Sequence, residues 1–170
     1  MDLNKKDKEK ISVAIAHVGC VNFPCDVEEA KINFERYTEE VDLLHQECPN
    51  TDIIMTGIIP RSGESEFTFQ TNSQIKDFNR KVDGHKELNE KFYYLDSWKY
   101  LFDNDKELAK AALYDEDDLH GIHLNTEGQD IIARAWLDEI ERLSIMHHER
   151  RLASMNEGHS EGKKTLPTQI

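Results

Sequence analysis

The chain has 170 residues, which suits one domain with a moderate hydrophobic core. Its net charge of −13 at pH 7 argues against a nucleic-acid-binding surface, because such a surface needs clustered basic side chains. No apolar run approaches the length that crosses a bilayer, and the charged residues 1–10 lack the apolar core of a secretory signal. We therefore expect a cytoplasmic protein with no nucleic-acid or membrane partner.

The cysteines are Cys20, Cys25 and Cys48, an odd number that favours free thiols in a reducing compartment. Cys20 and Cys25 lie near His17, but their spacing fits no standard zinc pattern. We expect no metal site and no cofactor.

Three apolar runs predict the strands of a sheet, after a charged lead-in over residues 1–10. The runs at 11–18 and 52–59 are nearly continuous, and a shorter one lies at 92–96. Uninterrupted apolar runs are typical of parallel strands that are buried on both faces.

Apolar residues that recur every three or four positions predict helices over 26–48 and 72–84. Thr71 and Gln74 have the spacing of a capping box, which places the start of the second helix beside them. A short helix is predicted over 104–113.

The stretch of residues 117–128 combines acids, histidines and glycines in one loop, and its end starts a helix predicted over 127–145. Thr126 and Gln129 again have capping-box spacing. A histidine held near acids by a packed helix suits proton transfer near neutral pH. The alternative is a solvated acidic turn with surface histidines.

The alternation of strands and helices predicts an α/β domain over 11–146 with a parallel sheet and right-handed crossovers. Residues 147–170 are polar and lack an apolar stripe, so a disordered tail is expected there. Sites in such folds form beyond the carboxyl ends of the strands. Those ends carry Gly19–Asn22, Pro60-Arg61 and Asp96-Ser97-Trp98, and the loop of residues 117–128 is expected to reach the same edge.

Several segments together resemble the central and C-terminal blocks of the SGNH/GDSL hydrolases, a flavodoxin-like α/β family of esterases and lipases. In chain order they are His17-Val18-Gly19-Cys20-Val21-Asn22, Gly57-Ile58-Ile59-Pro60-Arg61, Phe78-Asn79 and His123-Leu124-Asn125-Thr126-Glu127-Gly128. The resemblance implies a three-layer sandwich and a small-molecule ester substrate.

The resemblance assigns the catalytic base to His123. The acid that orients the base in the family stands three residues earlier, where this chain has His120. Asp117 could serve in a shifted register, and Asp118 could serve His123 from a different angle. These alternatives stay open at the level of sequence.

The resemblance also places oxyanion-hole donors at Gly19 and at the family's asparagine. That asparagine position holds Val21, with Asn22 one place later. Arg61 is a candidate substrate ligand, although an arginine after a strand is more often a surface or ion-pair residue. Nothing in the sequence indicates a reactive thiol at Cys20.

The family's Gly-Asp-Ser nucleophile block does not occur in the chain. Gly63-Glu64-Ser65 follows the wrong strand and is expected to lead into more loop rather than directly into a helix. The fold is therefore expected to be N-terminally truncated, with about three of the family's strands and an exposed sheet edge that invites pairing.

Two functions follow from these features. The first is an SGNH-type esterase-like domain that is inactive as this isolated chain because its serine lies elsewhere. The second is a non-catalytic remnant that acts as a structural or interaction domain.

Overall fold

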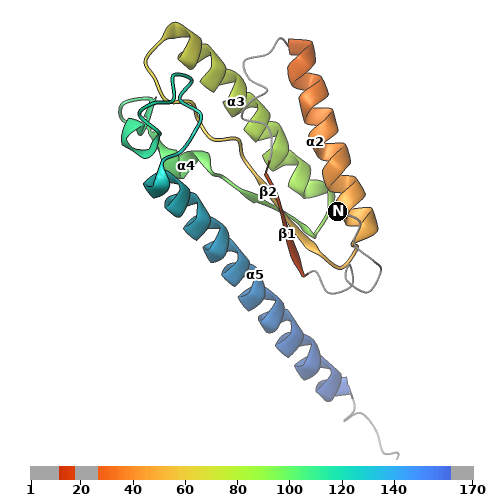
Figure 1. Ribbon diagram of the computed structural model, residues 1–170. Helices are drawn as coiled ribbons and strands as arrows, with labels where there is room; N and C mark the ends of the chain where they lie inside the picture. Colours follow the sequence, from red (N-terminus) through yellow and green to blue (C-terminus); the bar gives the residue numbers. More distant parts are fainter. Residues whose placement is uncertain (1–11, 18–26, 162–170) are drawn as a thin grey trace, which may run out of the picture. The chain divides into compact units, whose positions relative to one another are not determined.

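The structure is a computed structural model that describes residues 12–17 and 27–161 (Figure 1). The chain divides into two compact units, the first ending at Ala135 and the second beginning at Trp136. The sheet and the candidate site belong to the first unit.

The sheet consists of strands β1 (Val13–Ala16), β2 (Asp52–Thr56) and β3 (Phe92–Leu95), in the order β1-β2-β3. Both neighbouring pairs are parallel. The predicted parallel α/β architecture is therefore confirmed, although each strand is shorter than its apolar run. Beyond β2 the chain leaves the β-ladder, and the backbone amides of Ile58 and Arg61 bond to side chains of the following helix.

The central strand β2 is buried along its whole length, whereas every residue of the edge strand β1 is half-buried. A strand with neighbours on both sides keeps its amide groups paired and its side chains away from water. The apolar run that contains Ile53, Ile54 and Met55 reflects this central position.

Helices α2 (Val27–Glu47) and α3 (Glu66–His85) lie side by side and both contact the sheet (Figure 1). The rings of Phe34 and Phe78 meet edge to face, 6.1 Å apart. The Tyr37 hydroxyl donates to the Ala16 carbonyl at 3.1 Å, which ties α2 to the end of β1. The helix predicted over 26–48 is confirmed to within a residue at each end.

Helix α3 begins well before the predicted start at residue 72, because Ser65 is its N-cap. The Ser65 hydroxyl accepts a hydrogen bond from the Thr68 amide at 3.1 Å. Thr71 lies inside the helix, and its hydroxyl donates to the Phe67 carbonyl at 2.8 Å. The expectation that Ser65 leads into more loop was wrong, since the helix starts at the next residue.

The helix predicted over 104–113 is replaced by a hairpin and a short turn. After helix α4 (Trp98–Leu101), strands β4 (Phe102–Asp103) and β5 (Leu108–Ala109) pair antiparallel, and the 3₁₀ turn η3 (Ala111–Leu113) follows. The Asp103 carboxylate accepts from the Asp105 amide at 3.1 Å and the Lys106 amide at 3.3 Å. These bonds favour a turn over a helix, as Asp side chains commonly do.

Two further helical segments complete the described chain. The 3₁₀ turn η2 (Lys86–Leu88) continues from α3, and α5 (Thr126–Glu161) begins in the first unit and ends in the second. Helix α5 runs past 145 and through much of the segment where a disordered tail was expected. Residues 149–153, Glu-Arg-Arg-Leu-Ala, are all favourable helix formers and support this extension. Within the described residues, no helix combines the length and apolarity needed to cross a membrane.

The Ser65 cap yields a test of the observed start of α3. Ser65→Ala should lower the free energy of unfolding by about 1 kcal/mol, because an amide of the first turn loses its acceptor. Ser73→Ala is the matched control, since Ser73 is exposed inside the same helix and alanine is the better helix former there. Urea unfolding followed by circular dichroism measures both. Equal midpoints for the two variants would contradict the assignment of the cap.

Candidate functional site

The floor of the candidate site is the segment of residues 57–62, which follows β2. It is not a strand, yet residues 57–61 are buried and Ser62 is half-buried. Two asparagines of α3 bind its backbone, each through both atoms of the amide. Asn79 accepts from the Ile58 amide at 2.7 Å and donates to the Ile58 carbonyl at 2.8 Å. Asn72 does the same for Arg61, at 2.7 and 2.9 Å.

These two asparagines stand about two helical turns apart, so they lie on the same face of α3. Both are buried, on the side of the helix that also carries Ile75, Phe78 and Val82. Buried backbone groups need hydrogen-bond partners, and here side chains supply what a neighbouring strand would supply in a sheet. The segment is therefore fixed in position without belonging to a β-ladder.

The loop of residues 117–125 docks on this floor. The Ser62 amide donates to the Gly121 carbonyl at 2.8 Å, and the Tyr114 hydroxyl donates to the carbonyl of Pro60. Gly121 has φ of 59°, and a Cβ placed on it would lie 2.2 Å from the Ser62 oxygen. Only glycine fits this close approach in this conformation.

Asn125 closes the loop and starts α5. Its side-chain amide donates to the carbonyls of Ala112 at 2.8 Å and Tyr114 at 3.2 Å, and its side-chain oxygen accepts from the Gly128 amide at 3.0 Å. The residue that caps the helix is therefore Asn125 rather than the predicted Thr126. The Gln129 side chain donates to the Leu124 carbonyl at 2.8 Å, which strengthens the same turn.

The Asp118 carboxylate accepts the hydrogen bonds around which the loop is folded. One carboxylate oxygen accepts from the amides of Ile122 at 2.7 Å and His123 at 2.6 Å, and also contacts His123 Nδ1 at 3.0 Å. The other oxygen accepts from the His120 amide at 2.9 Å. The Asp118 side chain is only 7% exposed, whereas that of His123 is 70% exposed.

This environment shifts the acid strength of Asp118. Partial desolvation alone would raise the pKa of its carboxyl group. The amide hydrogen bonds from His123, His120 and Ile122, together with the nearby His123 charge, outweigh desolvation and hold this pKa well below its usual value. Asp118 is therefore ionised at neutral pH and can only accept hydrogen bonds.

The ionised carboxylate sets the tautomer of the neutral His123 ring. Nδ1 carries the proton, because it faces the Asp118 oxygen at 3.0 Å and the carboxylate has no proton to give. Nε2 is then left with its lone pair. A ring held this way, and exposed on its other side, has the arrangement of a general base with its orienting acid.

The other two candidates for the orienting acid do not take this position. The Asp117 side chain is exposed, and the structure gives it no bond to His123 or His120. The ring of His120 is likewise exposed, while its backbone serves the Asp118 carboxylate. The acid at His123 thus stands five residues before the base, which departs from the spacing of three in the family pattern.

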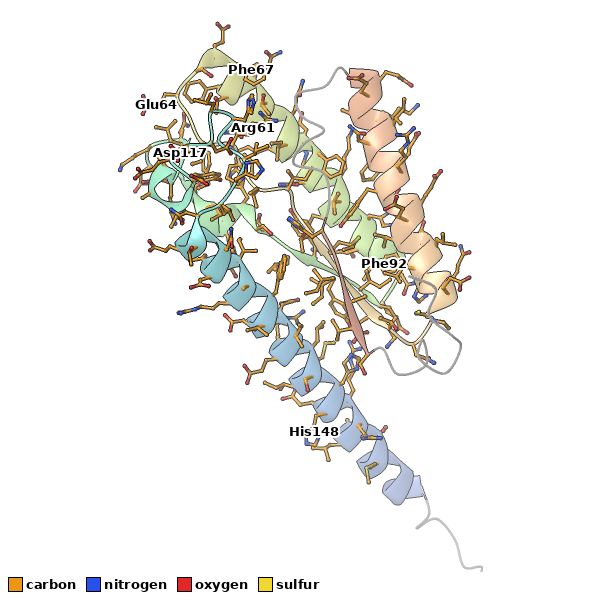
Figure 2. The ribbon with its side chains drawn as sticks, in the orientation of Figure 1. Arg61, Glu64, Phe67, Phe92, Asp117 and His148 are labelled. Atoms are coloured by element: carbon orange, nitrogen blue, oxygen red, sulfur yellow. The ribbon has the colours of Figure 1, made fainter. Side chains whose placement is uncertain are left out.

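Arg61 lies at the same end of the first unit as Asp117 (Figure 2). It is 7% exposed, and its guanidinium carbon lies 5.9 Å from the centre of the Phe67 ring. Its neighbour Ser62 bonds to Gly121, so the segment that follows β2 contacts the loop that carries His123. The predicted substrate-binding role of Arg61 stays a prediction.

The predicted oxyanion-hole residues Gly19 and Asn22 lie outside the described residues, as do Val21 and Cys20. Their roles stay predictions. In the two described ranges, no group of three or more potential ligands among His, Cys, Asp and Glu comes together to hold a metal ion.

Sequence reasoning missed the residues that hold the site together. At the level of sequence, Asn72 had no assigned role, and Asn79 was mentioned only within the family-like segment Phe78-Asn79. Both side chains nevertheless hold the backbone of residues 57–62 in position. The available signal was polar residues on the apolar face of a helix, because a buried asparagine must find partners. Tyr114 gave no comparable signal, since its bond to Pro60 joins parts of the chain far apart in sequence.

No protein-family model matches the sequence, and no curated protein matches it significantly. Solved structures do match. A protein described as a platelet activating factor from Streptococcus pneumonia superposes with a TM-score of 0.62 at 17% identity, covering 75% of this chain and 59% of that one. A GDSL-like lipase from Bacteroides thetaiotaomicron gives 0.58 at 16% identity, covering 78% of this chain and 62% of that one.

A carbohydrate esterase of family 3 from Talaromyces cellulolyticus matches with a TM-score of 0.56 at 17% identity, covering 82% of this chain and 60% of that one. At such identities the likeness is one of fold. The class of fold is flavodoxin-like α/β with a parallel sheet. Within that class, the chain has the fold of the SGNH/GDSL hydrolases, and it spans about three fifths of the length of the structures that it matches.

The hydrogen bonds at Asp118 predict a pH-dependent contribution to stability. Its pKa is depressed by folding, so its contribution is fully present above the unfolded value of about 4 and is lost as the pH falls toward the folded value. Asp118→Asn should therefore be less stable than the native chain at pH 7, with the difference shrinking toward pH 3. Urea midpoints across this range measure it.

Asp117→Asn is the control for that series, because it removes the neighbouring charge from an exposed side chain. It should change the midpoint little at any of these pH values. A pH-independent deficit for Asp118→Asn, or an equal deficit for Asp117→Asn, would contradict the role of the Asp118 carboxylate.

The asparagine contacts predict how much the free energy of unfolding falls when the segment of residues 57–62 loses a side-chain partner. Asn72→Ala should lower the free energy of unfolding by roughly 3 kcal/mol, because two buried backbone groups of Arg61 lose their partners. Gln70→Ala, at an exposed position of the same helix, should stay within about 0.5 kcal/mol. Urea unfolding compares the two, and a loss at Asn72 no larger than that at Gln70 would refute the assigned role.

Proposed function

We propose that this chain is an SGNH-type esterase-like domain that supplies the acid–base half of an ester hydrolase. His123 is the general base and Asp118 is the acid that orients it. The nucleophile comes from another polypeptide segment, so the isolated chain is inactive. The substrate is a small-molecule ester, in keeping with the hydrolase-like fold.

One observation carries this proposal, the hydrogen bond of 3.0 Å between His123 Nδ1 and a buried, ionised Asp118. It leaves Nε2 of an exposed ring as the basic atom. A base must reach the proton that it abstracts, and exposure at the end of the sheet provides that access. The likeness in fold to ester hydrolases is weaker support, because one fold hosts many functions. The hydrogen bond between His123 and Asp118 is therefore the main support for the proposal.

The serine of the family has no counterpart at the expected place, since the sequence lacks Gly-Asp-Ser. Ser65 is already engaged as the N-cap of α3, and its hydroxyl contacts the Thr68 amide and hydroxyl at 3.1 and 2.9 Å. Acyl transfer needs nucleophile, base and oxyanion donors together. We therefore assign the missing nucleophile to a segment that joins this domain.

The edge strand β1 is the proposed point of attachment for that segment. It is half-buried and apolar, and its sequence Val13-Ala14-Ile15-Ala16 has neither the charges nor the proline that commonly protect an edge. A further strand could pair with this edge and bring a nucleophile to the carboxyl end of the sheet. The shorter span of this chain relative to its structural neighbours is in keeping with such an addition.

A non-catalytic structural or interaction domain is the second candidate. The observation that favours it is the use of Asp118, which accepts three of its four hydrogen bonds from backbone amides. Those bonds order the loop whether or not His123 removes a proton.

The test is hydrolysis of p-nitrophenyl acetate by the purified chain and by His123→Ala. The two should be indistinguishable, because loss of the nucleophile alone removes several orders of magnitude of rate. A saturable difference between them would show that the chain already holds a nucleophile, and Cys20 would be the next residue to replace.

Addition of a segment with a buried strand and Gly-Asp-Ser tests the positive half of the proposal. Fused ahead of the chain, it should produce activity that His123→Ala and Asp118→Ala both abolish, while Asp117→Ala keeps it. A stable, folded fusion without any His123-dependent activity would favour the non-catalytic domain.

A further inference from the structure

A pocket of about 260 Å³ lies between helix α3 and the chain that runs from β3 into α4, within the first unit. Three charged residues of one face of α3 line its first wall, namely Lys76, Arg80 and Asp83. The facing wall consists of Tyr94, Asp96 and Trp98. Neither His123 nor Asp118 lines this pocket, so it is separate from the proposed acid–base pair.

The end of the pocket at Lys76 is positively charged. Lys76 Nζ lies 5.2 Å from the centre of the Trp98 ring and 4.6 Å from that of Phe102, and it forms no ion pair within the described residues. Arg80 pairs with Asp77 at 2.6 Å, but these side chains are 78% and 63% exposed. Such surface pairs contribute little to stability, so both cations can turn toward a carboxylate in the pocket.

The other end of the pocket is negatively charged, around the Tyr94 hydroxyl. Burial raises the pKa of Tyr94, and the nearby charges of Asp96 and Asp83 raise this pKa further. The Asp96 carboxylate accepts from the Trp98 amide at 3.1 Å, and no cation of the described chain pairs with it. Asp83 pairs with the partly exposed Lys86 at 2.5 Å. Two carboxylates that share one lysine suit the ammonium group of a ligand.

Two polar groups of the facing wall lack hydrogen-bond partners among the described residues. The indole Nε1 of Trp98 is buried and unpaired, although Trp98 is only 8% exposed. The Tyr94 hydroxyl stays protonated at neutral pH and lies where a Cβ on Gly57 would approach it to 2.5 Å. Buried donors normally have acceptors. A carboxylate oxygen could accept from the indole, and the tyrosine oxygen could accept from an ammonium group.

We propose that this pocket binds a small zwitterion whose ammonium and carboxylate groups stand several bonds apart, such as an ω-amino acid. The carboxylate lies at Lys76 and Arg80, and the ammonium group lies at Asp83 and Asp96. The helix advances about 10 Å from Lys76 to Asp83, which favours separated charges over the adjacent charges of an α-amino acid. This binding site is independent of ester hydrolysis.

The test is a ¹H–¹⁵N NMR titration of the full chain with 5-aminopentanoate. The comparison probes are its isomer 2-aminopentanoate, with both charges close together, and the singly charged pentanoate and pentylamine. 5-Aminopentanoate should bind roughly tenfold more tightly than each of them, because it alone can form charge-assisted hydrogen bonds at both ends. The chain has two tryptophans, so the indole signal of Trp98 should shift while that of Trp136 serves as the internal reference.

Charge-removing variants test each end of the pocket. Asp96→Asn keeps an oxygen that can accept from the Trp98 amide, and it should weaken binding of 5-aminopentanoate roughly fivefold. Lys76→Gln should weaken it to a similar degree. The matched controls are Asp105→Asn and Lys81→Gln, at exposed positions outside the pocket, and both should bind as the native chain does.

Asp83→Asn serves as a second variant at the negative end in case Asp96→Asn disturbs folding, and it should weaken binding in the same way. Equal affinity for pentanoate or pentylamine would identify a site for a single charge and overturn the proposal. Equal affinity for the two isomers, no saturable shift at millimolar concentrations, or native affinity in folded Lys76→Gln would overturn it as well. His123→Ala should bind 5-aminopentanoate normally, which separates this result from any outcome of the esterase assays.

Discussion

The site depends on the need to pair the buried backbone that continues beyond β2. The sheet ends at Thr56, yet the next residues stay buried, and an unpaired amide or carbonyl there would cost about 1–3 kcal/mol. Asn72 and Asn79 remove this cost with one side chain for each donor–acceptor pair. The segment can therefore leave the sheet and still form a rigid floor under the loop.

A second constraint sets the geometry of the loop itself. Asp118 gathers three amides and one ring nitrogen around a single carboxylate, so the chain must curl about that side chain. The curl, rather than the spacing along the sequence, decides which acid faces His123. An acid five residues away reaches the ring because Gly121 allows the tight turn between them. The spacing of the family motif is thus one solution among several to the same geometric requirement.

The sequence predicted the strands, the parallel sheet and the long α2 because these follow from apolar patterns that burial imposes. It misplaced the start of α3, since Ser65 and Thr71 both have side chains suited to a cap and only the packing of the chain chooses between them. It predicted a helix where Asp103 makes a turn, because the pairing of Phe102 with Ala109 depends on contacts that periodicity does not record. At the site, the sequence singled out His123 as a candidate base, which stays a prediction, while the contact between Asp118 and His123 depends on the folded loop.

The contacts that hold the loop are separate from the atom that would perform chemistry. The asparagine contacts, the bond from Ser62 to Gly121 and the amide bonds to Asp118 are all complete within the described chain. Nε2 of His123 takes no part in these contacts, and the His123 side chain is 70% exposed. A base that is oriented before its partner arrives loses little further freedom when the partner binds. If a nucleophile-bearing strand joins the edge at β1, the entropy cost of assembling the site therefore falls mainly on that strand, because Asp118 and the His123 ring are already held together by a hydrogen bond.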